Sequence, residues 1–580
     1  MKKTNRIYLA KRISLCDMLS NILKHFSSTV RHYRFASTSS CYTTKFSYRQ
    51  YLVSDLSNAN LIDTSVSVYG WLQHRRKKLF GVLRDHSGLI QFILPISMKE
   101  QRTILEKTPF ESCIHVKGIL KKRPERDINT DMTLGHLEIH VTDYKVINAC
   151  LPELPVNITK YHESHEITRL KYRYLDFRRD VMQERIRFRS SFIAKVREFL
   201  LKHSFVDIET PSLFRRTPGG AREFIVPTHL NEGGLFYALA QSPQQFKQLL
   251  MVGGFDRYFQ IAKCFRDETG RPDRQPEFTQ IDLELSFVSR ENIFSLVEQL
   301  VVACWPEKLE KVSFPRLTFA EAMSRYGTDK PDTRFGLEIE HSSEQLSITS
   351  PIPINNANDL IDGDNDIKYD ANNRKFLLNK TNNEQECLIK MGKFRLNLAD
   401  VLEKHYGIEL RKRRQWNFLW IIDFPLFTPM EDDRTKFEST HHPFTAPINE
   451  HVSLLSSKKD WPHITGQHYD LVLNGFEVAG GSIRIYDSSI QRFVLNDVLQ
   501  LPIEHLEHLL QALEYGAPPH GGIALGLDRL LALVLETEHI RDVIAFPKTG
   551  NGKDLMAQAP SLVEQSELDY YFLQINRKHS

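Results

Sequence analysis

The sequence predicts an α+β protein in which a small β-barrel precedes a larger domain of antiparallel strands flanked by helices. Three observations indicate this fold. Strand-like runs separated by turns fill residues 66–148. Charged and apolar side chains alternate along two antiparallel strands within residues 241–286, which a Gly- and Pro-rich turn joins. Residues 518–535, PPHGGIALGLDRLLALVL, combine a glycine-rich extended approach with a leucine helix of buried type.

Composition limits the class of protein. The chain has 580 residues, of which 41% are hydrophobic and 26% charged, and this balance indicates a soluble globular protein of two to four domains. No run of eighteen apolar residues occurs, so the sequence predicts no membrane-spanning helix. The seven cysteines are scattered and never spaced as CxxC, which favours a reduced compartment without structural zinc.

The first 45 residues differ in charge from the rest of the chain. They hold nine Lys or Arg and one acid, Asp17, which leaves 67 basic against 71 acidic residues and a net charge of −4 elsewhere. This segment is Ser-rich, with apolar residues at near-helical spacing, as is typical of a mitochondrial targeting peptide. A disordered basic extension that binds nucleic acid is the alternative. We expect residues 1–45 to be a targeting peptide and the protein to lie in the mitochondrial matrix.

The predicted barrel carries a basic hairpin. Between its first two strand runs lies HRRKKLFGVLRDHSG, residues 74–88, in which four consecutive basic residues precede Phe80. Basic charge beside an aromatic ring suits single-stranded nucleic acid, because phosphates bind the cations and an unstacked base covers the ring. A solvated hairpin with Phe80 packed into the barrel is the alternative, and a lone cluster would favour it.

The helix and strand after the barrel form the first block of the larger domain. Residues 168–200 include an amphipathic helix, and the strand FVDIETPSL follows it. Pro211 in that strand cannot donate to a central ladder, so it marks a sheet edge, a break or a subunit boundary.

The strands within residues 241–286 have an unusual polar face. Alternation places Arg266 and Glu268 on one face, and across the hairpin it places Gln280, Asp282 and Glu284 on one face. Opposite charges of this density indicate the floor of a site for a charged ligand. Later strands add further charged candidates, namely His441, His442, Asp470, Glu477, Arg484 and Arg529. The histidines lack zinc spacing, and the carboxylates favour magnesium.

Taken together, these motifs resemble the class II aminoacyl-tRNA synthetases and, within them, the aspartyl-tRNA synthetases of bacterial and mitochondrial type. FVDIETPSL with Pro211 resembles the first class II signature, FRDE with RQPEFTQIDLE the second, and GIALGLDRL the third. More specific strings are RLKYRYLDFRR, QSPQQFKQLLM, FPRLTFAEAMSRYGTDKPDTR, HHPFTAP and DVIAFPK. The similarity spans roughly residues 66–336 and 415–560.

The resemblance implies an OB-fold anticodon-binding barrel and an antiparallel catalytic sheet flanked by helices. The implied segments are a barrel at 46–150, a hinge at 151–175, catalytic parts at 176–336 and 399–565, a reduced insertion at 337–398 and a tail at 566–580. The insertion is Asn- and Asp-rich, which predicts a reduced, partly disordered remnant. A homodimer through the first-signature region, and no membrane, are also implied.

The implied reaction joins L-aspartate to tRNA-Asp for mitochondrial translation. ATP and aspartate form aspartyl-adenylate and pyrophosphate, and aspartate then passes to the 3′ end of the tRNA. Arg266, at the α-phosphate, and Arg529, at the γ-phosphate, are the catalytic residues. Positioning and charge stabilisation carry the step without a side-chain base. ATP binding is assigned to Arg266, Asp267, Glu268, Gln275, Phe278, Glu477, Gly526, Leu527, Asp528 and Arg529. Asp470 and Glu477 would hold Mg²⁺.

Amino-acid and tRNA contacts follow from the same resemblance. Aspartate binding is assigned to Ser242, Gln244, Lys247, Arg266, Asp282, His441 and Arg484. Lys247 and Arg484 would read the side-chain carboxylate, and asparagine would leave them uncompensated at a cost of about 3–5 kcal/mol. Many bacterial relatives have TPEGA where this chain has TPGGA, so Gly219 lacks a glutamate contact to the substrate ammonium. Anticodon contacts are assigned to Arg76, Phe80 and Gln91.

Two alternatives stay open at this point. Asparaginyl- and lysyl-tRNA synthetases share the barrel and the catalytic core. A synthetase-like protein that binds RNA without catalysis is the other alternative. Retention of Arg266, Glu477, Arg484 and Arg529 together argues against it, because a simple RNA-binding protein needs no magnesium and triphosphate site.

Overall fold

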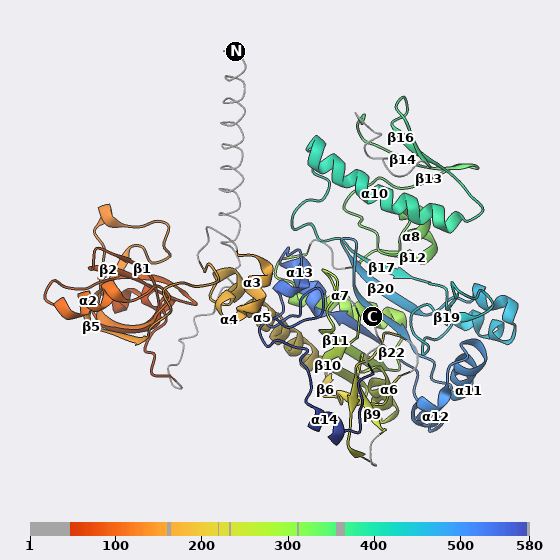
Figure 1. The fold of residues 1–580 in the computed structure, drawn as a ribbon. Helices are drawn as coiled ribbons and strands as arrows, with labels where there is room; N and C mark the ends of the chain where they lie inside the picture. Colours follow the sequence, from red (N-terminus) through yellow and green to blue (C-terminus); the bar gives the residue numbers. More distant parts are fainter. Residues whose placement is uncertain are drawn as a thin grey trace. The chain divides into compact units, whose positions relative to one another are not determined.

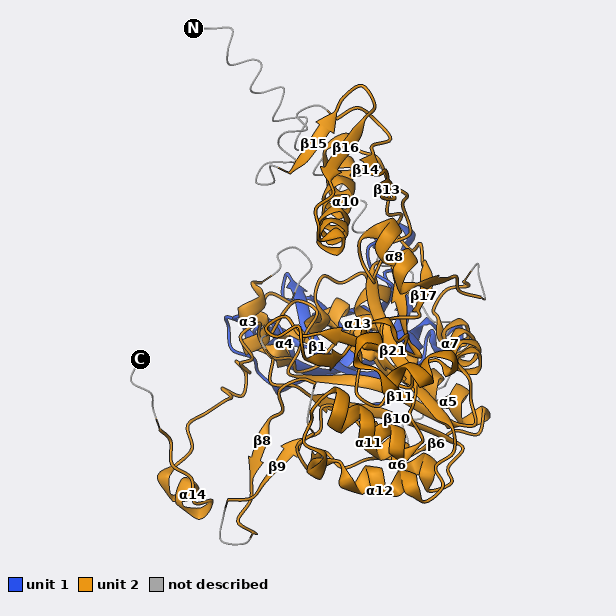
Figure 2. Ribbon diagram, turned by 90° about the vertical axis from the view of Figure 1, so that its right-hand side faces the viewer, with its two compact units in different colours: residues 1–155 blue, residues 156–580 orange. Residues whose placement is uncertain are grey.

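The computed structural model describes residues 47–158, 164–217, 220–230, 234–268, 270–309, 313–354 and 366–576. The predicted targeting peptide, residues 1–45, and the TPGGA departure at Gly219 lie outside these residues. The chain divides into two compact units between Pro155 and Val156 (Figure 2).

The first unit is a closed five-stranded barrel, as predicted (Figure 1). Its strands follow the order β1-β2-β3-β5-β4, and their bounds are β1 (Ser65–Arg76), β2 (Phe80–Asp85), β3 (Gly88–Ile93), β4 (Cys113–Lys122) and β5 (Leu137–Asn148), with helix α2 (Lys99–Lys107). Every second residue of β1 from Val66 to Leu72 is buried. This two-residue period directs one face of the strand into a core that also contains Ile90, Phe92 and Val116.

An eight-stranded sheet forms the centre of the second unit. Its order is β12-β17-β20-β21-β22-β11-β10-β6. The bounds are β6 (Val206–Asp207), β10 (Arg257–Phe265), β11 (Glu277–Ser286), β12 (Arg316–Thr318), β17 (Phe418–Ile422), β20 (His468–Leu473), β21 (Phe476–Ile483) and β22 (His520–Gly526). The strands pair antiparallel except at the two edges, where β12 runs parallel to β17 and β6 parallel to β10. The predicted antiparallel core is confirmed.

Helices flank this sheet. The helices of the second unit outside its insertion are α3 (Glu166–Lys171), α4 (Arg173–Asp176), α5 (Asp180–Lys202), α6 (Gln244–Val252), α7 (Arg290–Cys304), α8 (Phe319–Tyr326), α11 (Ser488–Phe493), α12 (Glu507–Glu514), α13 (Leu527–Val534) and α14 (Gln565–Tyr570). Helices α6 and α13 pack on β11, and α7 packs on β22 and α5. Helix α13 follows β22 directly. Leu527, Leu530 and Leu531 are buried as the sequence predicts, whereas Leu533 is half-buried.

Shorter strands surround the central sheet. A three-stranded sheet has the order β7 (Leu213–Phe214), β9 (Phe236–Leu239), β8 (Ile225–Pro227), and β18 (Phe427–Pro429) pairs with β19 (Phe437–Ser439). No helix of the described residues is both long and apolar enough to cross a membrane.

The predicted hinge over residues 151–175 is wrong in its second half. Helices α3 and α4 begin the second unit, because the guanidinium of Arg173 is buried and donates hydrogen bonds to the carbonyls of Arg541, Ile544 and Ala545 at 2.9–3.0 Å. These bonds attach α4 to the segment that follows α13.

The insertion was predicted to be a reduced, partly disordered remnant, and its described part is a folded subdomain with its own core. Helix α10 (Glu384–Tyr406) lies along a four-stranded sheet of order β13 (Glu340–His341), β14 (Gln345–Thr349), β16 (Lys375–Asn379), β15 (Ile367–Asp370) (Figure 1). The helix buries Met391, Phe394, Leu398 and Leu402 at helical spacing against the sheet. It also runs through the predicted boundary at residues 398 and 399. Much of the Asn- and Asp-rich stretch, residues 355–365, lies outside the described residues. The described subdomain projects from one end of the second unit (Figure 2).

Candidate active site

A cavity of about 860 Å³ lies against the central strands of the sheet. Helix α6, the β10–β11 hairpin, the segment around residue 441, strand β21 and the β22–α13 junction contribute to its wall. The cavity brings together fourteen predicted residues: Ser242, Gln244, Lys247, Arg266, Glu268, Gln275, Phe278, Asp282, His441, Glu477, Arg484, Gly526, Asp528 and Arg529. They come from segments far apart in the sequence, so the fold assembles the candidate site.

One end of the cavity rests on a buried charge network. The ammonium of Lys247 lies 3.2 Å from Asp282 Oδ1 and 3.4 Å from Glu284 Oε2. Arg484 donates to both oxygens of Glu284, from Nε at 2.9 Å and from Nη2 at 3.1 Å. All four side chains are buried. A planar guanidinium matches a carboxylate in this two-bond geometry, so Arg484 is held in one orientation.

Burial and charge act in opposite directions on the two carboxylates of this network. Burial raises the pKa of Asp282 above its usual value, although Lys247 lowers it in part. Burial also raises the pKa of Glu284, but the charges of Arg484 and Lys247 and the hydrogen bonds from Arg484 outweigh it, so the pKa of Glu284 falls below its usual value. Glu284 is therefore the firmly ionised member of the network.

Glu284 corrects the predicted basis of asparagine rejection. The two cations are not left uncompensated when no aspartate is bound, because Glu284 contacts both. An ammonium has three N–H donors, and Lys247 has two carboxylate partners among the described residues. A third donor is available for a ligand carboxylate. Gly522 makes room for Glu284, since a Cβ at residue 522 would lie 2.0 Å from Glu284 Oε2.

Two histidines lie beside the charge network. His442 lines the cavity, whereas His520 is buried outside its lining. Burial and the neighbouring Arg484 lower the pKa of His442 well below its usual value, and the ring contacts Arg484 Nη1. His520 donates from Nδ1 to the carbonyl of Pro518 at 2.7 Å, and its Nε2 accepts from Gln248 at 3.2 Å. These contacts hold both rings in the neutral form.

The other end of the cavity contains Arg266, just after the last residue of β10. Its guanidinium carbon lies 5.0 Å from the centre of the Phe278 ring. Among the described residues, its Nε has no hydrogen-bond partner. The register of β10 and β11 pairs Cys264 with Phe278, so Arg266 follows on the face of β10 that bears this pair. The predicted strand extended through Glu268, but β10 ends at Phe265.

Arg529 lies at this same end. It donates from Nη1 to the carbonyl of Glu477 at 2.7 Å and from Nη2 to Asp273 at 3.1 Å. About a third of its side chain is exposed (29%), which leaves it accessible from the cavity. Arg529 and Arg266 therefore supply positive charge where a polyphosphate would lie.

Asp470 and Glu477 form a carboxylate pair on neighbouring strands β20 and β21. Asp470 Oδ1 is buried without a partner among the described residues. A Cβ at Gly480 would lie 2.9 Å from that atom and 3.6 Å from Glu477 Oε1, so the glycine keeps open the space that both oxygens face. Burial and the charge of Glu477 raise the pKa of Asp470 well above its usual value. An orphaned oxygen, a second carboxylate and an open space fit a hard cation such as Mg²⁺.

Not every predicted residue lines the cavity. Asp267 is exposed outside it, Leu527 is buried in α13, and Asp470 lies behind Gly480. Asp528 lines the wall, but its oxygens bind Arg189 and the backbone amide of Thr279. The charge in the leucine helix is therefore paired within the protein, and it fixes α13 to β11 and α5.

Sequence reasoning missed two charged groups at the site. Glu284 was placed on the correct face but was not assigned a role. Lys330, within the string GTDKPDTR, binds Glu477 at 2.8 Å. The unusual concentration of charge on one strand was the signal for Glu284, and the family-specific string was the signal for Lys330.

The barrel of the first unit carries the residues predicted to contact the anticodon, namely Arg76, Phe80 and Gln91. In the register of β1, β2 and β3, Arg76 pairs with Phe80 and Gln91 pairs with Val82. Since residues two apart on a strand share a face, all three predicted residues lie on the outer face of the barrel. Gln91 donates to Glu138 at 2.9 Å, and sequence reasoning did not single out Glu138.

The chain is similar to known proteins over most of its length. Residues 165–550 match the family model of class II tRNA synthetases (D, K and N), and residues 66–147 match the OB-fold nucleic acid binding domain. Aspartate–tRNA ligase, mitochondrial, from Mus musculus is 45% identical, with 88% of this chain and 87% of the relative covered. The protein of that name from Homo sapiens is 44% identical, with 88% of each chain covered. Aspartate–tRNA(Asp/Asn) ligase from Dictyoglomus turgidum is 39% identical, with 89% and 97% covered.

Solved structures show the same fold at low sequence identity. Asparaginyl-tRNA synthetase from Pyrococcus horikoshii, complexed with asparaginyl-adenylate, has a TM-score of 0.59 and 19% identity, with 86% of this chain and 98% of that chain covered. Aspartyl-tRNA synthetase from Entamoeba histolytica has a TM-score of 0.57 and 21% identity, with 88% and 93% covered.

Proposed function

Because this chain belongs to the aspartate–tRNA ligases, which are class II tRNA synthetases of the D, K and N group, we propose how its cavity performs the family's reaction. That reaction is aminoacylation of tRNA-Asp. In the first step a carboxylate oxygen of aspartate attacks the α-phosphorus of ATP. The bond from that phosphorus to the bridging oxygen breaks, and pyrophosphate leaves. In the second step a hydroxyl at the 3′ end of tRNA-Asp attacks the aspartyl carbonyl carbon, the bond from that carbon to the phosphate oxygen breaks, and AMP leaves.

Arg266 and Arg529 stabilise the charge that develops on the nucleotide. Arg266 has an unsatisfied buried Nε and an aromatic neighbour, Phe278, on which adenine would stack. A fixed donor at the α-phosphate acts most strongly in the transition state, where negative charge builds on that group. Arg529 would bind the γ-phosphate. No side-chain base is required, since the attacking carboxylate is already ionised.

The buried cations Lys247 and Arg484 determine the specificity for aspartate. Their network is electrically balanced by Asp282 and Glu284 before a ligand binds. A lysine side chain would bring a further cation against two buried cations, which is unfavourable. An aspartate side chain adds a carboxylate that accepts from their remaining donors. Ser242, Gln244 and His441 would complete the pocket.

Asp470 and Glu477 would hold Mg²⁺ together with the phosphates of ATP. The bound ion would offset part of the negative charge of the phosphates. The protein's own contribution is the fixed spacing of the two carboxylates on neighbouring strands and the space that Gly480 leaves between them.

The outer face of the barrel would bind the anticodon. Phe80 would stack on an anticodon base, Gln91 would contact another, and Arg76 would bind the nearby backbone. A Phe80→Ala variant is expected to weaken binding of tRNA-Asp by about 1–3 kcal/mol in a filter-binding titration and to leave adenylate formation intact. Tyr48→Ala, an exposed aromatic change outside the three strands, is the control and should preserve tRNA affinity.

A homodimer is supported by the region of the first signature. Val206 at the edge strand β6 and Leu213 in β7 are both more than 40% exposed, and Pro211, which cannot donate to a strand ladder, lies between them in the chain. Val206→Glu with Leu213→Glu is expected to convert the dimer to a monomer in sedimentation. An unchanged sedimentation coefficient would refute this interface.

Location follows from the relatives named mitochondrial and from the composition of residues 1–45. We place the protein in the mitochondrial matrix. Deleting residues 1–45 from a fluorescent fusion should abolish import, and unchanged import would refute the targeting role.

Amino-acid-dependent exchange of pyrophosphate into ATP tests the central proposal. Exchange is expected with aspartate and not with asparagine or lysine, because the remaining donors of Lys247 and Arg484 bind a charged carboxylate more strongly than a neutral amide, and they repel a further cation. Exchange with lysine but not aspartate would overturn the assignment. A chain that binds RNA without catalysis would show no exchange with any of the three. Charging of purified tRNA-Asp and tRNA-Asn then reports which tRNA is used.

A further inference from the structure

Lys330 binds one carboxylate of the pair, Glu477, and has no role of its own in the proposed reaction. Its ammonium lies 2.8 Å from Glu477 Oε2. The other oxygen, Oε1, faces the space beside Gly480, as does Asp470 Oδ1. Lys330 therefore orients the Glu477 carboxylate without occupying the space between the two carboxylates.

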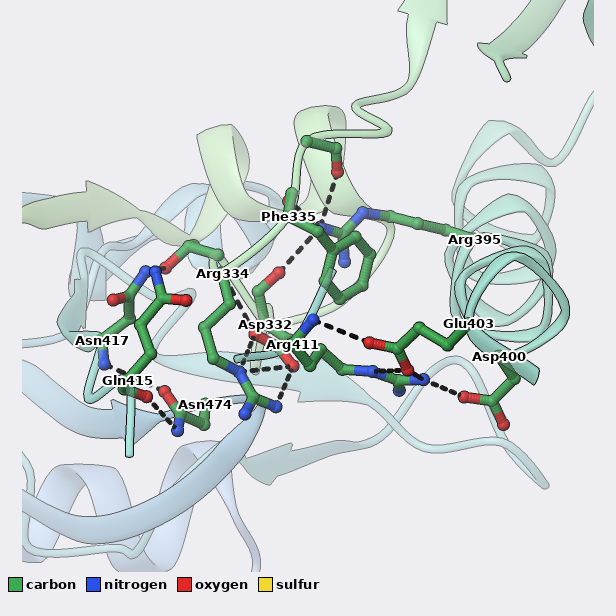
Figure 3. Close-up of polar contacts among 12 residues, drawn as sticks. Asp332, Arg334, Phe335, Arg395, Asp400, Glu403, Arg411, Gln415, Asn417 and Asn474 are labelled. Atoms are coloured by element: carbon green, nitrogen blue, oxygen red, sulfur yellow. Dashed lines mark hydrogen bonds and ion pairs between the residues drawn. The ribbon is translucent and has the colours of Figure 1, made fainter. Parts of the chain in front are cut away.

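The segment that bears Lys330 is attached to the insertion helix. Arg395 of α10 is buried, and it donates to the carbonyls of Asp332, Phe335, Gly336 and Leu337 at 2.7–3.1 Å (Figure 3). Its guanidinium carbon also lies 4.2 Å from the centre of the Phe335 ring. One side chain thus binds four carbonyl oxygens within six residues.

A glycine contact holds the near end of the same segment. Gly327 ends helix α8 in the left-handed conformation, with φ of 65°. A Cβ at Gly392 of α10 would lie 2.6 Å from the carbonyl oxygen of Gly327, so the two backbones touch. Helix α10 therefore fixes both ends of the segment 327–337, and Lys330 lies between them.

The far side of this segment packs on the hairpin that carries Glu477. Arg334 forms a two-bond ion pair with Asp332 (Figure 3). A Cβ at Gly475, in the turn between β20 and β21, would lie 3.2 Å from Asp332 Cβ. The neighbouring Asn474 donates to the carbonyl of Gln415 at 2.8 Å. A continuous set of contacts therefore runs from α10 through residues 330–334 to the turn before Glu477.

We propose that Lys330 is a positioning residue that holds Glu477 for Mg²⁺–ATP, and that the insertion helix α10 sets its place through Arg395. This inference rests on the proposed function, because it assigns Glu477 to the nucleotide site. It gives the insertion a role in binding the nucleotide, at a distance from the substrate aspartate.

Charge also favours Lys330 in the loaded site. ATP complexed with Mg²⁺ has a net negative charge, and Asp470 and Glu477 add two more carboxylates. A nearby ammonium offsets part of this repulsion and fixes the carboxylate orientation. The aspartate end has its own cations, Lys247 and Arg484, so the loss of Lys330 should act on nucleotide binding and not on aspartate binding.

Calorimetric titration of the full chain with Mg²⁺ and α,β-methylene ATP tests the proposal. Lys330→Met is expected to weaken binding of this complex about tenfold, as outer partners of metal ligands typically do. Lys330→Arg, which keeps the charge, should restore most of the affinity. Affinity for aspartate, titrated alone, should stay unchanged in both variants.

Lys375→Met is the matched control. Lys375 in the insertion forms an ion pair of 2.7 Å with Glu340, at an exposure close to that of Lys330 (36% against 40%). Its removal should leave nucleotide affinity unchanged. Equal losses in the Lys330→Met and Lys375→Met variants would show a general effect of the insertion and would overturn the positioning role.

A double variant tests the link to α10. Arg395→Lys keeps a cation but has too few donors for four carbonyls, so it should weaken nucleotide binding by itself. If Arg395 acts through Lys330, adding Arg395→Lys to Lys330→Met causes little further loss. Additive losses would overturn the link. Circular dichroism checks that each variant is folded. Because Lys330 is half-exposed, its replacement should not unfold the chain, so the first test stands even if the buried Arg395 cannot be replaced.

Failure of this inference is distinct from failure of the proposed function. No aspartate-dependent exchange in the unsubstituted chain would overturn the function. Normal exchange, with nucleotide binding by Lys330→Met as tight as in the unsubstituted chain, would overturn the inference alone.

Discussion

At the end of the cavity that Lys247 and Arg484 floor, each cation lies within 3.4 Å of a carboxylate, although Asp282 Oδ2 lacks a described partner. At the end that contains Arg266, the buried Nε of that arginine lacks a described partner, as does Asp470 Oδ1 beside Gly480. We call the first end the finished network, because both of its cations are paired before any ligand arrives. The second end is completed by its ligand. The phosphates of ATP would pair with Arg266, and they would supply further oxygen ligands for a cation held by Asp470. We therefore expect Lys247 and Arg484, whose charges are already paired, to determine selectivity, and Arg266, whose partner is the substrate, to contribute to catalysis.

The largest expected effect comes from breaking the finished network. Glu284→Ala leaves Lys247 and Arg484 buried with only Asp282, which should lower the free energy of unfolding by about 3–5 kcal/mol in urea titrations. The exposed two-bond pair of Arg325 and Glu338 provides a control of the same chemistry. Glu338→Ala should cost about 0–1 kcal/mol. Similar losses in both variants would contradict the distinction between the two ends.

At the end of the cavity that contains Arg266, the Arg266→Ala change should lower the reaction rate more than the free energy of unfolding. The rate of aspartate-dependent exchange is expected to fall about 100- to 1000-fold, because a charge-stabilising donor is lost from the transition state. Affinity for aspartate should fall far less. Lys263→Ala is the control, since Lys263 lies three residues earlier on the opposite face of β10 and pairs with the exposed Glu277. Activation that survives in Arg266→Ala would refute the role of Arg266.

The carboxylate pair offers a smaller and more specific test. Asp470→Asn keeps the shape of the side chain but removes a charge that faces the space beside Gly480. The Mg²⁺ concentration for half-maximal exchange should rise at least about tenfold. A Mg²⁺ titration at fixed ATP measures it. An unchanged requirement would exclude Asp470 as a ligand of the ion.

The smallest expected effect is a pH dependence of the finished end. Burial lowers the pKa of His520 below its usual value of about 6.5. As the pH falls through about 6.5, the unfolded chain therefore takes up a proton that the folded chain excludes, and stability is lost; above that pH the contribution is complete. His520→Gln should reduce the slope of unfolding free energy between pH 5.5 and 6.5 by up to about 1.4 kcal/mol per pH unit. Equal slopes for the variant and the parent would show that His520 does not titrate in this way.

Much of the fold was readable from local pattern. Alternation along β1 and β11 predicted the barrel and the charged floor, because a strand places every second residue on one face. The leucine run predicted α13. The resemblance supplied the roles of Arg266, Arg484 and Arg529, and the cavity contains all three.

The insertion was beyond the reach of such patterns. Its strands are short, and its Asn- and Asp-rich composition suggested a remnant. Met391, Phe394 and Leu398 of α10 are nevertheless buried against a four-stranded sheet whose strands come from residues 340–349 and 367–379. Local propensity decides little when a helix and four short strands gain stability only by packing together.

The sequence by itself determined which residue types line the site and which strands present them, since both depend on spacing within a few residues. Only the tertiary structure decided their partners. Glu284 meets Arg484 across 200 residues, and Arg173 meets the carbonyl of Ala545 across 372. Lys330 meets Glu477 through a segment fixed by Arg395. Such pairs form because buried charges and hydrogen-bond donors need partners, and the packed chain supplies them from distant segments. The local sequence does not show which distant residue will be the partner.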